Sequence, residues 1–359
     1  MTQKMPLFKV KPVDRDYFRA RLDSFLPKKV VDVHTHVWLA RFRAAGDHTD
    51  RAVSWPHLVA AENPVEDLLE TYKLMMPGRE VIPVIFGMTL VPADDLEAGN
   101  RYVADCAARH NLPGLIFANP RWSAEEFEQR IVAGGFLGAK VYLTWSDPAL
   151  AGDQIQIYDF LPPHQLEALD RRGWIIMLHI PRSGRLKDPV NLRQLCEIDQ
   201  QYPDAKVIVA HVGRAYCPED VGEAFGVLAG TRNLYFDISA NTNAEVFEHL
   251  IRAVGPRRIL FGSDLPIVRM RMRRICDNGT YVNLVPRGLY GDVSGDENMR
   301  EVDAAEAGRL SFFLYEEIDA FRRASERAGL GRGDVEDVFC NNALRMLKEA
   351  GMDFGKQAQ

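Results

Sequence analysis

The sequence is poor in cysteine, and the few cysteines that it has do not form a disulfide pattern. Its 359 residues include five cysteines, which stand singly at Cys106, Cys196, Cys217, Cys276 and Cys340. Neighbouring pairs are missing and the count is odd, which argues against a small disulfide-framed domain. The pattern predicts reduced thiols and a cytoplasmic location.

Long hydrophobic runs and an excess of positive charge are also lacking. No stretch approaches the ~18 apolar residues of a membrane span, and residues 1–22 contain no apolar core of signal-peptide length. The formal net charge of −6 gives no overall attraction to nucleic acid or to anionic lipid. We therefore expect neither a membrane nor a nucleic acid as a partner.

One segment departs from this charge balance. Residues 269–274 read RMRMRR. A short basic run is usually a solvated face of a loop or helix, and we predict this for the segment. A role that faces an anion or a neighbouring subunit is the alternative.

The sequence does contain a regular series of short apolar runs. Hydrophobic residues make up 47% and charged residues 26% of the chain, as in a soluble globular protein with a large core. The runs are continuously apolar, which is typical of parallel strands that are buried on both faces. They cover residues 29–38, 80–90, 112–120, 135–145, 174–181, 205–213, 233–240 and 257–266.

Amphipathic segments alternate with these runs. Residues 162–173, for example, read PPHQLEALDRRG and end at Gly173, which is a typical helix stop. Eight strands that alternate with helices predict an α/β fold, a (β/α)8 TIM-like barrel with long loops at the C-terminal face of the strands. A doubly wound open sheet is the alternative.

The predicted barrel has an extension and two insertions. We assign residues 1–28 to an N-terminal extension and residues 29–359 to the barrel. Residues 39–64, which contain the Trp55-Pro56 pair, and residues 267–300 are expected to be long loops after the first and last strands. Loops at this position commonly cover the substrate.

Polar side chains gather at the C-terminal ends of the predicted strands. All strands of a barrel point to one mouth, so residues that are far apart in the sequence meet there. The first strand ends with His34 and His36, and later strands contribute Lys140, His179, His211 and Asp264. The sequence therefore predicts a polar site at the mouth.

The spacing of His34 and His36 suits a metal ion. Residues two apart on a strand share a face, and Asp32 lies deeper on that face, where it would pack or support a ligand. Imidazoles together with one carboxylate suit Zn, Fe, Mn, Ni or Co. Two hydrogen-bonded core histidines are the alternative for the pair by itself, and the polar residues on the other strands favour the metal.

The chain resembles the metal-dependent amidohydrolase superfamily in six segments. They are, in order, DVHTH, GAKVY, MLHI, VIVAHVGR, ILFGSDLP and VEDVFCNNALRML, the last of which is similar to the family's closing helix. The resemblance extends from about Lys29 to Lys348. Within the superfamily it points to the amidohydrolase 2 group, which includes aminocarboxymuconate-semialdehyde and resorcylate decarboxylases. The set is specific for the fold and the metal site, and much less specific for the reaction.

The resemblance implies roles for the residues at the mouth. His34, His36, His179 and Asp264 would hold a divalent transition metal, with zinc as the first expectation and manganese or iron as alternatives. His211 would be an acid or base in mononuclear relatives and a ligand in binuclear ones, where Lys140 would bridge two metals as a carbamate. In many mononuclear relatives the corresponding lysine is not a ligand, and Lys140 would then cap the barrel mouth or bind an anion of the substrate. We expect one metal per chain, with two as the alternative.

Other residues near the strand ends are candidates for binding the substrate. Arg182 and Arg214 each follow a site histidine by three residues, and a guanidinium can bind a carboxylate through two parallel hydrogen bonds. An ion pair within the protein is the alternative for each. Tyr142 and Trp145 would line the pocket, or else only pack against their neighbours.

The hypothesis for function is a metal-dependent hydrolase of a small amide, lactone or related substrate. A metal with an open position lowers the pKa of bound water to about 7, and Asp264 or His211 would take the proton. A non-oxidative decarboxylase of an aromatic or unsaturated carboxylic acid is the first alternative. A redox-metal oxygenase and a non-catalytic metal-binding barrel subunit follow. We expect a homo-oligomer, or a hetero-oligomer with a paralogue.

Overall fold

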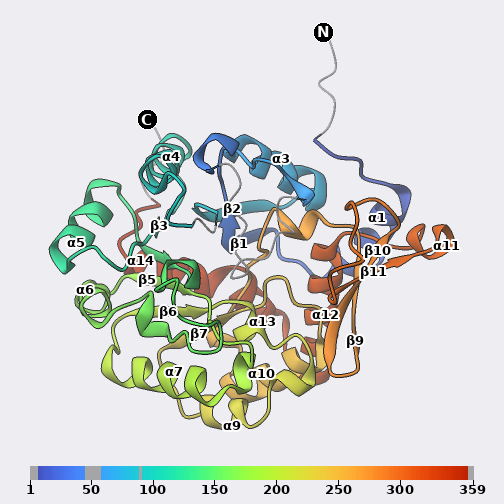
Figure 1. The fold of residues 1–359 in the computed structure, drawn as a ribbon. Helices are drawn as coiled ribbons and strands as arrows, with labels where there is room; N and C mark the ends of the chain where they lie inside the picture. Colours follow the sequence, from blue (N-terminus) through green and yellow to red (C-terminus); the bar gives the residue numbers. More distant parts are fainter. Residues whose placement is uncertain (1–6, 45–57, 89–90, 355–359) are drawn as a thin grey trace.

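The computed structural model describes residues 7–44, 58–88 and 91–354. They form an α/β barrel in which helices surround a core of parallel strands (Figure 1). The barrel strands are β1 (Lys29–His36), β2 (Glu80–Phe86), β3 (Ile116–Phe117), β4 (Gly138–Val141), β5 (Ile175–Leu178), β6 (Lys206–Val209), β7 (Leu234–Asp237) and β8 (Ile259–Leu260).

The strands follow one another around the barrel in sequence order. Ladders of backbone hydrogen bonds pair β1 with β2. Further ladders pair each strand from β3 to β7 with the strand that follows it, up to β8. Single parallel bridges make the two remaining seams, from Ile85 to Gly114 and from Thr35 to Leu265. At the second seam the amide of His36 donates to the carbonyl of Leu265 over 2.9 Å. This order excludes the doubly wound sheet, whose strand order reverses at a switch point.

Each predicted strand is present but shorter than its apolar run. β3 and β8 have only two residues each. Apolar runs report burial, and burial continues past the last ladder bond, as at Phe261 and Leu265, which are both fully buried. The run therefore locates a strand better than it defines its ends.

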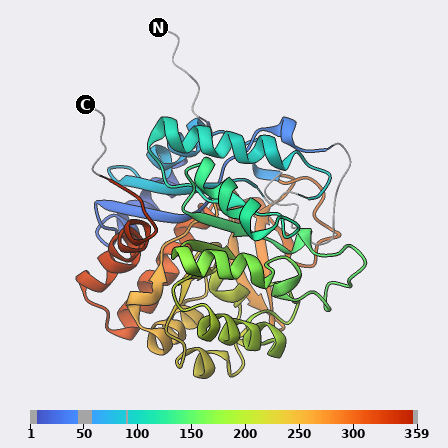
Figure 2. The ribbon, with the colours of Figure 1, turned by 90° about the vertical axis from the view of Figure 1, so that its left-hand side faces the viewer.

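Helices cover the outside of the strands. Ser123 caps α5 (Ala124–Ala133) by accepting from the amide of Glu126, and Gly173, at φ 61°, ends α6 (Pro163–Arg172) as its sequence predicts. Figure 2 shows the cyan and green helices stacked along one side of the barrel. None of the described helices combines the length and the apolarity needed to cross a membrane. The helices are α3 (Val65–Met75), α4 (Leu96–His110), α5 (Ala124–Ala133), α6 (Pro163–Arg172), α7 (Pro189–Gln201), α8 (His211–Arg214), α9 (Ala224–Leu228), α10 (Ala244–Val254), α11 (Ala304–Ala307), α12 (Phe313–Ala328), α13 (Arg332–Glu336) and α14 (Asn342–Glu349).

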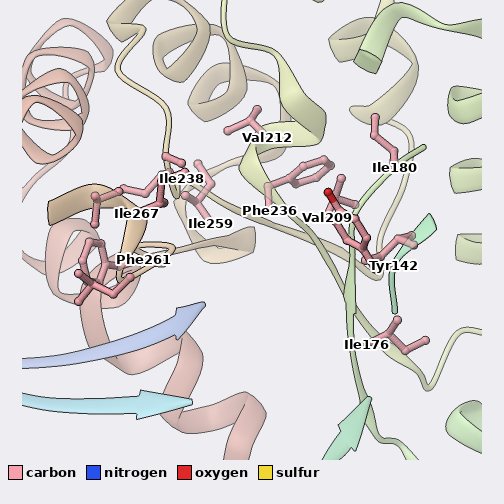
Figure 3. Packing of buried hydrophobic residues seen from close by; sticks show 14 of the residues in the cluster. Tyr142, Ile176, Ile180, Val209, Val212, Phe236, Ile238, Ile259, Phe261 and Ile267 are labelled. Atoms are coloured by element: carbon pink, nitrogen blue, oxygen red, sulfur yellow. The ribbon is translucent and has the colours of Figure 1, made fainter. Parts of the chain in front are cut away.

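The core has two layers. Outside the barrel, strand residues such as Ile176, Val209 and Phe236 pack in one large cluster with the helices (Figure 3). Inside, strand residues form a second cluster with Met346 of α14. Asn342 of α14 donates to the carbonyls of Pro256 and Ile259, both over 2.9 Å, so the last helix is tied to the end of β8 opposite the mouth.

The second insertion is not the long loop that the sequence predicts. It contains β9 (Arg273–Asp277) and β10 (Thr280–Pro286), which form an antiparallel hairpin, and leads into β11 (Met299–Val302). The hairpin turns at Asn278 and Gly279, which have φ values of 51° and 76°. Asn-Gly between two strands is the sequence signal of such a turn. In the first insertion, η2 (Ala40–Phe42) is described, whereas Trp55 and Pro56 lie outside the described residues.

The prediction that residues 269–274 form a solvated basic face is wrong. Arg271 is only 5% exposed, and its two terminal nitrogens each donate to a carboxylate oxygen of Asp14 over 2.7 Å. Arg274 donates to the side chain of Asn283 and to the carbonyl of Ala240. These acceptors come from distant segments, so the sequence around the run does not reveal them.

The N-terminal extension is attached to the barrel through this pairing. Its described part contains α1 (Pro12–Tyr17) and the π-helical turn η1 (Phe18–Leu22). Asp14 of α1 is fully buried and also accepts from the hydroxyl of Ser311 over 2.9 Å. The extension therefore packs against the segments on either side of β9–β11.

The prediction of reduced thiols is wrong for one pair of cysteines. Cys217 and Cys276 form a disulfide, although they lie 59 positions apart in the sequence. The fold brings the loop after β6 next to β9, and no local spacing reveals this. Cys106, Cys196 and Cys340 are free. The cysteine pattern thus no longer supports a cytoplasmic location, which stays a prediction.

Candidate metal centre

His34 and His36 converge on one carboxylate at the barrel mouth. Both side chains are buried, and their ring centres lie 5.4 Å apart. Oδ1 of Asp264, in the turn after β8, lies 3.2 Å from Nε2 of His36 and 3.6 Å from Nε2 of His34. Strands at opposite ends of the sequence thus place three potential ligands together.

Hydrogen bonds determine which ring nitrogen is free on three of the histidines. Nδ1 of His36 donates to the carbonyl of Gly87 over 2.8 Å, and Nδ1 of His211 to the carbonyl of Ser239 over 3.1 Å. Because a carbonyl only accepts, each Nδ1 carries the proton and each Nε2 keeps its lone pair. Nδ1 of His34 likewise pairs with Asp237 over 2.8 Å. These are the tautomers in which Nε2 can bind a metal.

His211 and Asp264 complete a compact group with His34. One potential ligand atom from each of these residues lies within 4.8 Å of the others. His211 and Asp264 have φ values of 56° and 66°, in the left-handed region that residues other than glycine rarely adopt. The loops after β6 and β8 therefore hold these side chains in a conformation that the surrounding structure must stabilise.

His179, after β5, lies beside this group without belonging to it. Its ring centre is 5.4 Å from that of His211 and 4.8 Å from that of Tyr142. The side chain is buried, and its Nδ1 has no hydrogen-bond partner among the described residues. A buried imidazole nitrogen without a partner is costly, and a metal at the mouth would give this ring an interaction that the protein itself does not supply.

The charges of these groups suit a divalent cation. Burial lowers the pKa of His34 to about 4, and it lowers the pKa of His179 well below the usual range, so both rings are neutral at pH 7. Burial alone would raise the pKa of Asp264, but the adjacent rings of His36, His34 and His211 hold it below its usual value. Neutral imidazoles and an ionised carboxylate are the forms that bind a metal.

Lys140 of β4 lies within electrostatic reach of the group. Its side chain is almost fully buried, and Nζ lies 5.4 Å from the ring centre of Phe86 and 5.6 Å from that of Tyr142. Burial lowers the pKa of Lys140 to about 8, although Asp264 and Asp237 oppose this. An amine with this pKa is partly neutral at pH 7, so a carbamate and a free ammonium are both accessible, and the number of metals stays a prediction.

Asp237, at the end of β7, is the main site residue that the sequence reading missed. It is fully buried and accepts a hydrogen bond from Nδ1 of His34. It also accepts from the amide of His211 over 2.8 Å and from the amide of Ser239 over 3.1 Å. One carboxylate therefore orients two histidines. It ends strand seven in the segment LYFDIS, so the rule that found the other residues could have found it.

Asp32 holds the end of β1 in place through three hydrogen bonds. Its carboxylate accepts from the amide of His34 over 3.2 Å, from the amide of Ser263 over 2.9 Å and from the hydroxyl of Tyr72 over 2.7 Å. It thereby joins the end of β1 to the turn that carries Asp264.

Gly262 provides the space in which His34 lies. A Cβ atom at this position would come within 2.8 Å of Cβ of His34 and 3.3 Å of Cβ of Asp237. Contacts this short between carbon atoms are repulsive, so only glycine fits here without displacing the histidine.

The predicted substrate-binding residues have different surroundings. Arg182 forms an ion pair with Asp188, with 3.0 Å between the atoms, which agrees with the alternative for this residue. Arg214 donates to the carbonyls of Pro181 and Arg182, and its charge acts on His179 and Tyr142. Trp145 packs against Phe117, with 6.4 Å between ring centres. The structure thus brings Arg214 and Tyr142 to the mouth.

Comparisons with known proteins agree with this architecture. The family model of the amidohydrolase 2 family, which is described as "Amidohydrolase", matches residues 31–348. No match was found among curated proteins.

Solved structures of low sequence identity share the fold. A 4-oxalomesaconate hydratase from Rhodopseudomonas palustris has a TM-score of 0.55 at 15% identity, over 89% of this chain and 96% of that one. A dihydroxybenzoic acid decarboxylase from Polaromonas, with bound manganese and 2-nitroresorcinol, has a TM-score of 0.52 at 15% identity, over 90% of this chain and 97% of that one. An amidohydrolase from Burkholderia multivorans with bound zinc has a TM-score of 0.52 at 12% identity, over 89% of this chain and 99% of that one.

The family match covers most of the chain and includes every residue of the centre described above. The order of the strands and the histidines and carboxylates at the mouth agree with it. The chain belongs to the amidohydrolase 2 family, whose members are metal-dependent enzymes built on a TIM barrel.

Proposed function

We propose that the protein is a metal-dependent hydrolase of a small substrate that carries a carboxylate next to an ester, lactone or amide bond. The observation that supports it best is the hydrogen bond from Nδ1 of His211 to the carbonyl of Ser239. It leaves a basic Nε2 on His211 beside the carboxylate of Asp264. Hydrolysis begins with the removal of a proton from water, and these two groups are bases.

His34, His36, His179 and Asp264 would hold the metal, with zinc or manganese as the candidates. When bound, the ion would act as a Lewis acid that polarises the carbonyl group of the substrate and makes water more acidic. The neutral rings of His34 and His36 and the ionised Asp264 supply the ligand types that both metals accept.

The protein's own groups account for the proton transfers. Asp264 or His211 takes a proton from water as its oxygen adds to the carbonyl carbon. The same residue then returns the proton to the leaving alcohol or amine as the C–O or C–N bond breaks. Arg214, whose charge reaches His179 and Tyr142, would bind the substrate carboxylate.

Non-oxidative decarboxylation is the second candidate, and Lys140 favours it. This reaction requires an acid that protonates the carbon from which CO2 leaves. Lys140 is a buried group with a pKa of about 8, and the ring of Tyr142 beside it could stack on an aromatic acid.

The two candidates are distinguished by the isotopes in the product. Protein loaded with zinc or manganese is screened against lactones, amides and aromatic carboxylic acids. In H2(18)O a hydrolase places one heavy oxygen in the product carboxylate. In D2O a decarboxylase releases CO2 and places deuterium on carbon, and this result would replace the proposal. No turnover of any substrate by fully loaded protein would favour a non-catalytic barrel.

Asp264→Asn tests the role of the carboxylate. We expect kcat to fall by roughly 10²–10⁴-fold, because the variant loses both a ligand charge and a base. Asp16→Asn, exposed on α1 and outside the centre, is the matched control and should retain nearly full activity. Near-normal turnover of Asp264→Asn would contradict the proposed mechanism.

A further inference from the structure

The β9–β10 hairpin is covalently attached to the loop that carries His211. The disulfide joins Cys276 of β9 to Cys217 in the loop after β6. Cys217 directly follows Tyr216, whose ring centre lies 6.5 Å from that of His211. The link therefore holds the inserted hairpin against a residue next to the candidate metal centre.

Two tyrosines and two arginines form the contact between hairpin and loop. Tyr281 of β10 meets Tyr216 edge to face, with 4.8 Å between ring centres. Arg274 of β9 lies 4.8 Å from the ring centre of Tyr216 and 4.5 Å from that of Tyr281, and the corresponding distances of Arg185 are 5.4 and 5.0 Å. We call Arg185, Tyr216, Arg274 and Tyr281 the mouth wall.

The mouth wall carries positive charge that the protein does not fully neutralise. Arg185 pairs with Asp220 over 2.7 Å. Arg274 forms no ion pair within the described part of the chain, and its hydrogen bonds go to the neutral acceptors Asn283 and Ala240. The charge of Arg214 acts on both tyrosines of the wall. Aromatic rings next to guanidinium groups suit a flat ligand with a negative charge.

We propose that the mouth wall determines substrate specificity by receiving a planar carboxylic acid, and that the Cys217–Cys276 disulfide holds the wall in place. Substrate affinity then depends on the thiol–disulfide state of the protein. This inference rests on the proposed function, in that it assumes a carboxylate substrate at the centre.

The geometry favours one route of reduction. Cys276 is exposed, whereas Cys217 is fully buried. A thiolate of a dithiol reductant attacks Sγ of Cys276, the S–S bond breaks, and Cys217 leaves as a thiolate that takes a proton. The second thiol of the reductant then attacks the reductant sulfur that is bound to Cys276. The mixed disulfide breaks, and Cys276 is released as a thiol. The protein gains two thiols and the reductant becomes a disulfide.

The first test asks whether the disulfide holds the β9–β10 hairpin in place, and it requires no substrate. Metal-loaded, full-length protein is compared before and after treatment with dithiothreitol. Alkylation under denaturing conditions should trap the three free cysteines before treatment and all five afterwards. Amide hydrogen exchange in residues 273–286 should become faster on reduction, while exchange in β1 should not change. Five thiols in untreated protein, or unchanged exchange in the hairpin, would overturn the proposal.

The second test measures binding with isophthalate, a flat and unreactive dicarboxylate. We expect its Kd, measured by calorimetry, to rise roughly fivefold or more on reduction, because a loosened wall must be ordered before it binds. The metal content should stay the same. Failure of the oxidised protein to bind isophthalate, or equal affinity in both states, would overturn the role of the wall.

Two variants separate the disulfide from other effects of the reductant. The double variant Cys217→Ser/Cys276→Ser should show the weak binding and the fast exchange without treatment, and dithiothreitol should not change either. Cys196→Ser removes a free thiol outside the wall and should behave as the wild type in both states. If the exchange result holds and no substrate is hydrolysed, the proposed function fails while the attachment of the hairpin stands.

Discussion

At the scale of single residues, the centre depends on the hydrogen bonds that orient its imidazoles. Asp237, the carbonyl of Gly87 and the carbonyl of Ser239 each hold one Nδ1. The partner of each Nδ1 is as important as the histidine itself, because it decides which nitrogen faces the metal.

The double variant His34→Ala/His36→Ala should lose its metal, because it removes two adjacent donors. Metal analysis of purified, dialysed protein measures this directly. His164→Ala is the matched control, since His164 lies on α6 and bonds to the carbonyl of Trp122, away from the centre. Full metal retention by the double variant would show that the site is elsewhere.

Asp237→Asn should weaken metal binding by about 10–100-fold without removing any ligand. The neutral amide stabilises the Nδ1–H of His34 less and orients His211 less well. Competition with a chelator of known affinity gives the change. Asp199→Asn provides the comparison, because Asp199 is also buried and accepts from the backbone amides of Arg232 and Asn233. An equal effect of the two variants would reduce Asp237 to a structural role.

The metal-free protein should lose stability as the pH falls from about 6.5 to about 4. Burial lowers the pKa of His34 from 6.5 to about 4 in the folded state, so only the unfolded chain binds a proton in this range. The free energy of unfolding therefore decreases as the pH decreases, and below pH 4 this group makes no further difference. Urea unfolding across the range measures it. In His34→Asn the free energy of unfolding should depend less on pH in this range. An identical dependence would contradict the assignment of the effect to His34.

At the scale of the elements, the turn after β8 shows how closely the backbone approaches the site. Gly262→Ala should reduce both stability and metal affinity, because the new Cβ would lie 2.8 Å from Cβ of His34. Thermal unfolding and metal titration of the same preparation measure the two effects. Gly226→Ala, in α9, has no atom within 4 Å of the new Cβ and should be neutral or slightly stabilising. Normal metal affinity in Gly262→Ala would mean that β1 moves freely to make room.

At the scale of the whole molecule, one buried ion pair joins the N-terminal extension to the region of the second insertion. Asp14→Ala should destabilise the fold by about 3–5 kcal/mol, because it leaves Arg271 buried without a counter-charge. Chemical unfolding measures the loss. Asp16→Ala, exposed on the same helix, should change stability by no more than about 0.5 kcal/mol. Equal stability of the two variants would show that the extension is not part of the cooperative unit.

The sequence by itself determined the barrel and most of the centre. Buried strands leave continuous apolar runs, and a polar residue at the end of such a run is conspicuous because burial normally excludes it. His34, His36, His179, His211 and Asp264 could therefore be named before their positions were known. The missed Asp237 and the missed Asn-Gly turn carried signals of the same local kind.

Only the tertiary structure decided which distant groups meet. The buried ion pair of Arg271, the hydrogen bonds of Arg274, the ion pair of Arg182 and the Cys217–Cys276 disulfide each depend on a partner that lies close in space. Composition and spacing describe a residue's neighbours along the chain, whereas the pairing of charges and thiols depends on the neighbours that folding brings. For this reason the sequence located side chains that meet at the mouth, and it did not reveal the surroundings that orient them.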